Sequence, residues 1–214
     1  MAQRKYRLTD RLIMALDGLL RADAPEASGA DVPSPAVAIA DSVLAGKANA
    51  ESARLMRVNH TGEICAQALY LAQASLARAE TTRQMLENAA QEERTHLRWC
   101  AQRLEELQAS PSHLNGVWFA GAYVLGLASA AAGDSVSLGF LEETEKQVVA
   151  HLDEHLGKLP VADRKSRAIL LQMRRDEARH ASRAASMGAR ALPAPVRGLM
   201  RLQAMVMKTV ASRI

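Results

Sequence analysis

Apolar residues recur along most of this chain at the spacing of an amphipathic helix. The pattern predicts a first helix over about residues 53–79 and a second that reaches about residue 109. An apolar stretch that begins near Val117 leads into a third helix that ends near Gly157, and a fourth is predicted over residues 163–187. No segment shows the alternation of a β-strand, so the sequence predicts an all-α bundle.

Turn-forming residues separate the predicted helices. The segment Glu80–Thr82 offers a turn in which Thr81 or Thr82 is the expected N-cap of the second helix. Pro160 and Asp163 separate the third helix from the fourth.

The first fifty residues differ in composition from the rest. A short amphipathic segment over residues 5–22 leads into a stretch rich in Ala, Pro, Ser, Gly and Asp. Pro33 and Pro35 oppose a continuous helix, so we expect a linker with at most a short helix near residues 36–45. The predicted parts are an N-terminal segment with its linker and a helical domain, residues 1–50 and 51–214.

Composition supports a helical protein of a reducing compartment. Hydrophobic residues make up 49% of the chain and aromatic residues only 3%, so Ala, Leu, Val and Met must form the core. The only cysteines, Cys65 and Cys100, lack the spacing of a zinc or redox motif, and no structural disulfide is expected. The N-terminus has no pattern of a secretory signal.

The end of the chain is basic. Residues 178–214 contain seven Lys or Arg and no acid, and Leu199, Leu202, Val206 and Val210 recur there at helical spacing. A basic amphipathic helix suits an anionic membrane surface better than a DNA groove, so no nucleic-acid partner is expected. The alternative is a helix that packs on the bundle as a cap.

The stretch 107–133 contains no Asp, Glu, Lys or Arg, and its length alone would suit a transmembrane helix. Pro111, His113 and Asn115 interrupt it, and a break in a helix inside a membrane would leave backbone groups unpaired. We expect instead a connection that is buried against the bundle or dips into one leaflet.

Two short motifs carry the candidate chemistry, Glu93-Arg-Thr-His96 and Glu177-Ala-Arg-His180. Residues three apart share one helical face, so each motif can present a carboxylate and an imidazole to the same metal ion. Either motif alone often arises by chance on a solvated helix.

Two further glutamates match these motifs across the predicted hairpins. Glu63 precedes Glu93 by 30 residues, and Glu145 precedes Glu177 by 32. In each case the midpoint falls beside a predicted turn, so an antiparallel hairpin places the isolated glutamate level with a Glu-x-x-His motif.

The two hairpins together would assemble four carboxylates and two imidazoles, from Glu63, Glu93, His96, Glu145, Glu177 and His180. Burying these anions is too costly without compensating charge, and two divalent cations would balance them. Carboxylate and imidazole ligands without thiolate favour iron or manganese over zinc. The alternative is that these residues form ordinary surface salt bridges.

The segments around these residues resemble the demethoxyubiquinone hydroxylases, ferritin-like di-iron monooxygenases of ubiquinone biosynthesis. The resemblance runs from about Ala53 to the C-terminus and rests on RVNHTGEICAQ, EERTHL, LEETEKQVVAHL and RRDEARHA. It implies a ferritin-like four-helix bundle with an extra N-terminal segment and a C-terminal amphipathic helix. It also implies that the six residues bind two iron ions and that Glu93 and Glu177 bridge them.

The resemblance further implies hydroxylation of a polyprenylated demethoxy-benzoquinol with O₂. Manganese is the alternative metal, and NADH is a candidate electron donor. The expected partners are the quinol, a membrane surface and other proteins of ubiquinone biosynthesis. The expected location is peripheral, on the cytoplasmic side of the cell membrane.

Several neighbouring residues have more than one interpretation. His60 is either an outer partner of the site or a structural histidine, and His151 either lines a route for substrate or reductant or is structural. Asp176 and Glu92 either orient the opposite histidines or are solvated. The residues expected to belong to the core are Cys65, Tyr70 and Trp99.

Two other functions stay open on the sequence alone. A ferritin-like iron-storage or peroxide-scavenging protein would share the same ligands, and a membrane-associated helical scaffold would bind no metal. The charge-free stretch and the basic tail favour the hydroxylase over a storage protein, because an iron-storage shell has little reason to expose them.

Overall fold

A computed structural model describes residues 32–40 and 44–214, and the residues from Val32 onward form one unit. The amphipathic segment predicted over residues 5–22 lies outside the described residues. The helices are α2 (Gly46–Leu76), α3 (Glu80–Glu106), α4 (Asn115–Ala131), α5 (Asp134–Lys158), α6 (Arg164–Ser186) and α7 (Ala194–Ala211). The described part of the chain contains no strand, which confirms the all-α prediction.

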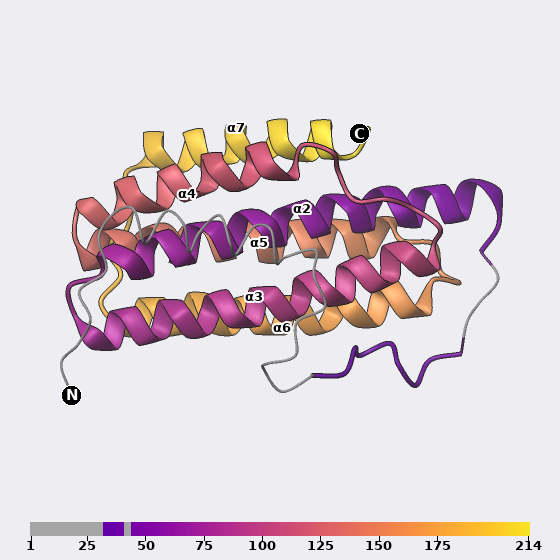
Figure 1. Ribbon diagram of the computed structural model, residues 1–214, viewed down its shortest axis with the longest axis horizontal. Helices are drawn as coiled ribbons and strands as arrows, with labels where there is room; N and C mark the ends of the chain where they lie inside the picture. The colour runs from indigo at the N-terminus through magenta and orange to yellow at the C-terminus, as the bar shows by residue number, and fades with distance from the viewer. Residues whose placement is uncertain (1–31, 41–43) are drawn as a thin grey trace. The chain divides into compact units, whose positions relative to one another are not determined.

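Two helical hairpins form the core of this unit. Short turns join α2 to α3 and α5 to α6, and each pair packs along its length. The four helices run alongside one another as a ferritin-like bundle, and α4 and α7 lie along one side of it (Figure 1). The division of the chain at residue 50 stays a prediction.

The apolar core consists of two clusters, one on each side of a polar layer. One cluster takes residues from all four helices of the two hairpins, among them Leu55, Met56, Leu104, Leu152, Ile169 and Met173. The other contains Leu69, Tyr70, Leu86, Leu138, Leu141 and Ala184. Each fully buried aliphatic side chain contributes about 1.5–3 kcal/mol to the free energy of unfolding, so the clusters stabilise the bundle on both sides of the polar layer.

The first hairpin has a cap that differs from the prediction. The N-cap of α3 is Ala79, which makes no side-chain hydrogen bond, so neither Thr81 nor Thr82 has that role. Instead, the carboxylate of Asp134 accepts hydrogen bonds from the backbone N–H of Arg78 at 3.0 Å and of Ala79 at 2.8 Å. The cap is supplied by the start of α5, which no local pattern before α3 could indicate.

In the second hairpin, α6 begins as predicted at Asp163, its N-cap, whose carboxylate accepts a hydrogen bond from the Ser166 N–H at 3.0 Å. The same oxygen accepts from the guanidinium of Arg103 on α3 at 2.9 Å, and both side chains are buried. This ion pair therefore joins α3 to the start of α6 at one end of the bundle.

The charge-free stretch becomes a helix of its own, α4, which packs along α2. It is separated from α5 at Gly133, whose φ of +106° favours glycine. Among the described residues, no helix is long and apolar enough to span a membrane. The packing of α4 along α2 agrees with one of the two arrangements expected for this stretch, a connection buried against the bundle.

The start of the first helix and the tail differ in detail from the prediction. Residues 35–38 form turns, which is compatible with a linker that contains at most a short helix, but α2 begins at Gly46 rather than near Ala53. In α7, Met200 and Ala211 are the buried residues, whereas the row identified in the sequence, including Leu199 and Leu202, is largely exposed. The tail helix thus covers the bundle with one face and leaves another apolar face outside.

The close approach of α4 to α2 generates a stability prediction. A Cβ atom at Gly126 would lie 2.5 Å from the Leu69 carbonyl oxygen and 2.7 Å from the Ala72 Cβ, whereas one at Gly121 would meet nothing within 4 Å. Gly126→Ala should lower the free energy of unfolding by about 1–3 kcal/mol, because the helices must separate. Gly121→Ala, in the same helix, is the control and should be neutral or stabilising by about 0.5–1 kcal/mol. Urea unfolding measures the free energy of unfolding of both variants. Equal values would contradict the close contact between α4 and α2.

Candidate metal centre

All six residues predicted as ligands meet between the two apolar clusters. Glu63 comes from α2, Glu93 and His96 from α3, Glu145 from α5, and Glu177 and His180 from α6. Each is only 1–4% exposed. Such burial excludes the interpretation of these residues as surface salt bridges, because solvated ion pairs would not be withdrawn from water.

The six residues form two overlapping groups, each with side-chain atoms within 4.8 Å of one another. One group consists of Glu63, Glu93, His96 and Glu177, and the other of Glu93, Glu145, Glu177 and His180. Glu93 and Glu177 belong to both. Two ions held by these groups would share these two carboxylates.

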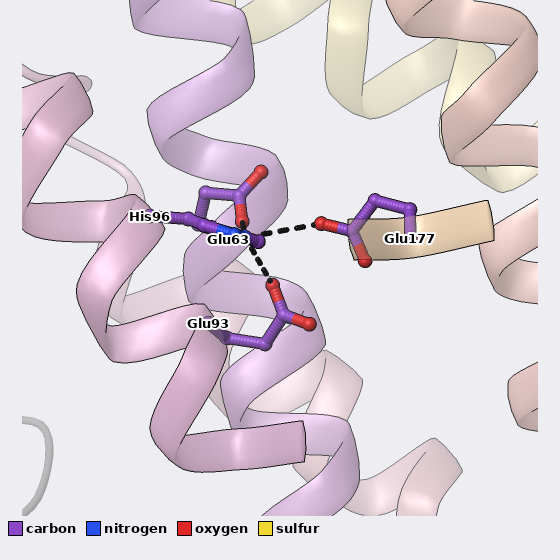
Figure 2. A group of neighbouring side chains, drawn as sticks. All are labelled: Glu63, Glu93, His96 and Glu177. Carbon is purple, nitrogen blue, oxygen red and sulfur yellow. Dashed lines mark ion pairs between the residues drawn. The ribbon is translucent and has the colours of Figure 1, made fainter. Parts of the chain in front are cut away.

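The imidazoles face the carboxylates through the same ring nitrogen. In the first group, Nδ1 of His96 lies 3.4 Å from oxygens of Glu63 and Glu93 and 3.1 Å from one of Glu177 (Figure 2). In the second, Nδ1 of His180 lies 3.4 Å from oxygens of Glu93 and Glu145 and 3.2 Å from one of Glu177.

Several buried atoms of the site lack a hydrogen-bond partner. They are Oε2 of Glu63, both carboxylate oxygens of Glu93, Nδ1 of His96 and Oε1 of Glu177. Buried polar atoms are seldom left unsatisfied, because each costs about 1–3 kcal/mol. Their convergence and their chemistry fit a hard or borderline cation such as Fe²⁺ or Mn²⁺.

The pKa values of the buried carboxylates also favour a bound cation. Burial, together with the charges of Glu93 and Glu177, raises the pKa of Glu63 well above its ordinary value, and burial and Glu177 do the same for Glu145. Burial opposes ionisation of Glu93, but its contacts with His180 and His96 outweigh it and lower its pKa. The pKa values of Glu63 and Glu145 are thus shifted in the opposite direction to that of Glu93, whereas a bound cation would favour the ionised form of each of these three groups.

The outer nitrogen of each imidazole contacts a carboxylate of the opposite hairpin. Nε2 of His96 donates to Asp176 on α6 at 3.2 Å, and Nε2 of His180 donates to Glu92 on α3 at 3.1 Å. These bonds fix the ring orientation and direct Nδ1 inward, as metal-binding histidines require. Of the two interpretations weighed for Asp176 and Glu92, the structure supports the orienting one.

Tyr70 takes part in the site, although its sequence context placed it in the core alone. It is fully buried, and its hydroxyl donates a hydrogen bond to Oε1 of Glu145 across the bundle. Its position seven residues after Glu63, two turns along one helical face, is the sequence signal that could have indicated this contact. Trp99 does pack in the core, with its ring 5.3 Å from that of His96.

The other neighbours lie around the ligands rather than among them. His60 is 2% exposed, its Nδ1 has no hydrogen-bond partner, and burial lowers its pKa to about 4. The His151 ring lies 3.8 Å from that of His155. Cys65 is only partly buried, which corrects the expectation that it belongs to the core.

A largely apolar cavity of about 470 Å³ reaches the ligands. Glu63, Glu93, Glu145 and Glu177 line it, as does His151. Its walls come from α2, α4, α5 and α7, and include Val58, Leu69, Leu125, Phe140, Met200 and Met207. Met205 of α7 also lines the cavity and is 54% exposed, so the cavity extends to the surface beside α7.

A family described as ubiquinone biosynthesis protein COQ7 matches residues 50–211, which include all six residues and the cavity. The chain belongs to the COQ7 family.

Two relatives in the COQ7 family illustrate the similarity. A protein named 3-demethoxyubiquinol 3-hydroxylase from Xanthomonas axonopodis pv. citri is 54% identical over 185 residues, which cover 86% of this chain and 85% of the relative. The protein of the same name from Variovorax paradoxus is 51% identical over 207 residues, 96% of this chain and 98% of the relative. The similarity thus extends into the first fifty residues, beyond the resemblance found in the sequence motifs.

The raised pKa values of Glu63 and Glu145 generate a prediction about metal removal. In the metal-free protein, their contribution to stability is present below the ordinary value of 4.5 and is lost as pH rises through the raised values. The lowered pKa of Glu93 acts with the opposite sign, but only below 4.5. A bound cation should therefore raise the melting temperature more at about pH 8 than at about pH 5. Thermal unfolding with added Mn²⁺ and with a chelator measures the difference; equal shifts at both pH values would contradict it.

Proposed function

We propose that this chain is a 3-demethoxyubiquinol 3-hydroxylase that works with two iron ions. The carrying observation is the pair of buried ligand groups that share Glu93 and Glu177 at one end of an apolar cavity. The identity of the substrate comes from the relatives named for this activity. The alignments with this chain cover 85% and 98% of the length of the two relatives.

The six residues suit two iron ions in number, charge and chemistry. Four carboxylates balance two divalent cations, and an imidazole stands in each group. Two iron ions held there would supply the O₂ chemistry of the hydroxylation. Manganese fits the same ligands, so the choice of iron rests on the reaction rather than on the geometry.

The surrounding side chains hold the ligands in fixed positions. Asp176 and Glu92 keep the two imidazoles oriented, and Tyr70 holds the carboxylate of Glu145. Since the ligands also lie between two apolar clusters, little movement is needed when substrate binds.

The cavity suits a quinol with a long prenyl tail. The aromatic head would lie against the ligand carboxylates, while the tail would follow the apolar walls towards Met205 and the surface. The walls also exclude water from the reacting carbon. In the balanced reaction, one oxygen atom of O₂ enters the ring C–H bond and the other leaves as water. A pair of electrons comes from a reductant, for which NADH is our candidate.

The cavity favours the hydroxylase over the alternatives. An iron-storage or peroxide-scavenging protein needs access for ions or peroxide, not a large apolar cavity that ends at the ligands. A metal-free scaffold gains nothing from burying four carboxylates and two imidazoles together, and it would leave several of their buried polar atoms unpaired.

Turnover is the direct test of this function. Iron-loaded protein supplied with 3-demethoxyubiquinol, O₂ and NADH should form the hydroxylated quinol, identified by mass spectrometry. Glu145→Gln should reduce the rate by more than about a hundredfold, because a lost ligand exceeds the 10–100-fold effects of outer partners. Glu142→Gln on the same helix, where Glu142 pairs with Lys146, is the control and should retain the rate. Iron-loaded protein that leaves the quinol unchanged with NADH or with a chemical reductant would refute the proposal.

We further propose that the protein binds the cytoplasmic face of the cell membrane through α4 and α7. Both helices contribute to the cavity wall and also expose apolar side chains. The exposed ones are Val117, Val124, Leu199, Leu202, Met205 and Val206. Arg197 and Arg201 lie in α7 next to this row, so anionic lipid would add an electrostatic attraction. Other proteins of ubiquinone biosynthesis stay candidate partners.

Flotation with anionic vesicles tests the membrane proposal. The protein should float with the vesicles at low salt, and the double variant Leu199→Glu and Leu202→Glu should reduce the bound fraction at least about tenfold, because it places charge in the apolar row. Val161→Glu, at an 89% exposed site in the turn between α5 and α6, is the control and should bind as the unaltered protein does. Equal flotation of all three would exclude α7 as the contact.

A further inference from the structure

Arg179 of α6 joins the two carboxylates that orient the histidines. Its Nη1 donates to Oδ1 of Asp176 at 2.8 Å, and its Nη2 donates to Oε2 of Glu92 at 2.7 Å. Asp176 in turn contacts His96, and Glu92 contacts His180. One guanidinium is thus connected, through one carboxylate on each side, to both imidazoles of the site.

The connection needs the shape of an arginine. Two nitrogens of a planar guanidinium can donate in fixed directions to two separate carboxylates, whereas the ammonium of a lysine is a single point charge. The Arg179 side chain is 57% exposed, so solvent screens much of its charge. Its position and hydrogen bonds should therefore matter more to the site than its charge does.

The two carboxylates are supported unequally. Asp176 also accepts hydrogen bonds from Nε2 of Gln172, at 3.0 and 3.1 Å, and its side chain is only 8% exposed. The side chain of Glu92 is 44% exposed, and its partners among the described residues are Arg179 and His180. Loss of Arg179 would leave Asp176 in place and release Glu92.

We propose that Arg179 is a positioning residue that holds Glu92 against His180 and so controls one of the two ion positions. The position concerned is the one formed by Glu93, Glu145, Glu177 and His180. The inference rests on the proposed function, since it assumes that the two ligand groups bind ions. The proposal predicts that ion binding at this position depends on Arg179, whereas binding at the other position depends on it much less.

Titration of metal-free protein with Mn²⁺, followed by paramagnetic resonance of free and bound ion, tests the proposal without turnover. Arg179→Ala should weaken one ion by about 10–100-fold, the usual effect of an outer partner, and the other by less than about threefold. Arg179→Lys should show the same loss, because the charge alone does not hold Glu92. Arg183→Ala, at an exposed arginine one turn further along α6, is the control and should bind both ions as the unaltered protein does.

A double variant separates positioning from a general loss of stability. Since Arg179 acts through Glu92, Arg179→Ala combined with Glu92→Gln should bind the weaker ion no worse than Glu92→Gln alone, whereas independent effects would multiply. If Arg179→Ala fails to fold by circular dichroism, Arg179→Lys and its double variant carry the same test.

The outcomes distinguish this inference from the function on which it rests. Unaltered protein that binds fewer than two Mn²⁺ ions would refute the proposed metal centre. Two tight ions in the unaltered protein, with both retained or both equally weakened in Arg179→Ala, would refute the role of Arg179 alone. Full recovery of the weaker ion in Arg179→Lys would also refute it, because the effect would then be one of charge.

Discussion

The structure depends on the burial of four carboxylates and two imidazoles inside a helical bundle. Each of these residues is at most 4% exposed, and apolar clusters close the layer on both sides. A cluster of this kind is unfavourable unless its charges are compensated and its polar atoms are paired. Much of the remaining architecture can be understood as a means of meeting that requirement. The hairpins bring the ligands to one level, the outer carboxylates orient the rings, and Tyr70 satisfies one oxygen of Glu145.

The outer contacts cross between the hairpins in both directions. Glu92 on α3 reaches the histidine of α6, while Asp176 on α6 reaches the histidine of α3. The buried pair of Arg103 and Asp163 joins the same two helices at one end of the bundle. The two halves of this layer are therefore held together by bonds that would not involve the proposed cations, so under the proposed function the site would stay organised before metal binds.

The sequence predicted the features that depend on spacing within a hairpin. The separations of Glu63 from Glu93 and of Glu145 from Glu177 were enough to place these residues level, because two helices joined by a short turn have little freedom of register. Contacts between elements distant in the chain were not predictable in this way. The cap that Asp134 provides for α3, and the separate packing of α4 along α2, depend on where the folded chain brings them. In α7, apolar residues occur on more than one face, so periodicity alone did not reveal which of them pack inward.

The position of α7 has a consequence for the choice of substrate. The helix forms part of the cavity wall and also exposes apolar side chains to the outside, and Met205 belongs to both sets, so the cavity and the outer apolar surface lie within one helix diameter, about 10 Å, of each other. Under the proposed function, a quinol head could meet the ligands while the distal isoprene units stay in the lipid. A protein that encloses only the head and the first isoprene units of such a molecule would not select for the length of the rest of the tail. The same fold would then serve organisms whose quinones differ in side-chain length, without any change at the reacting centre.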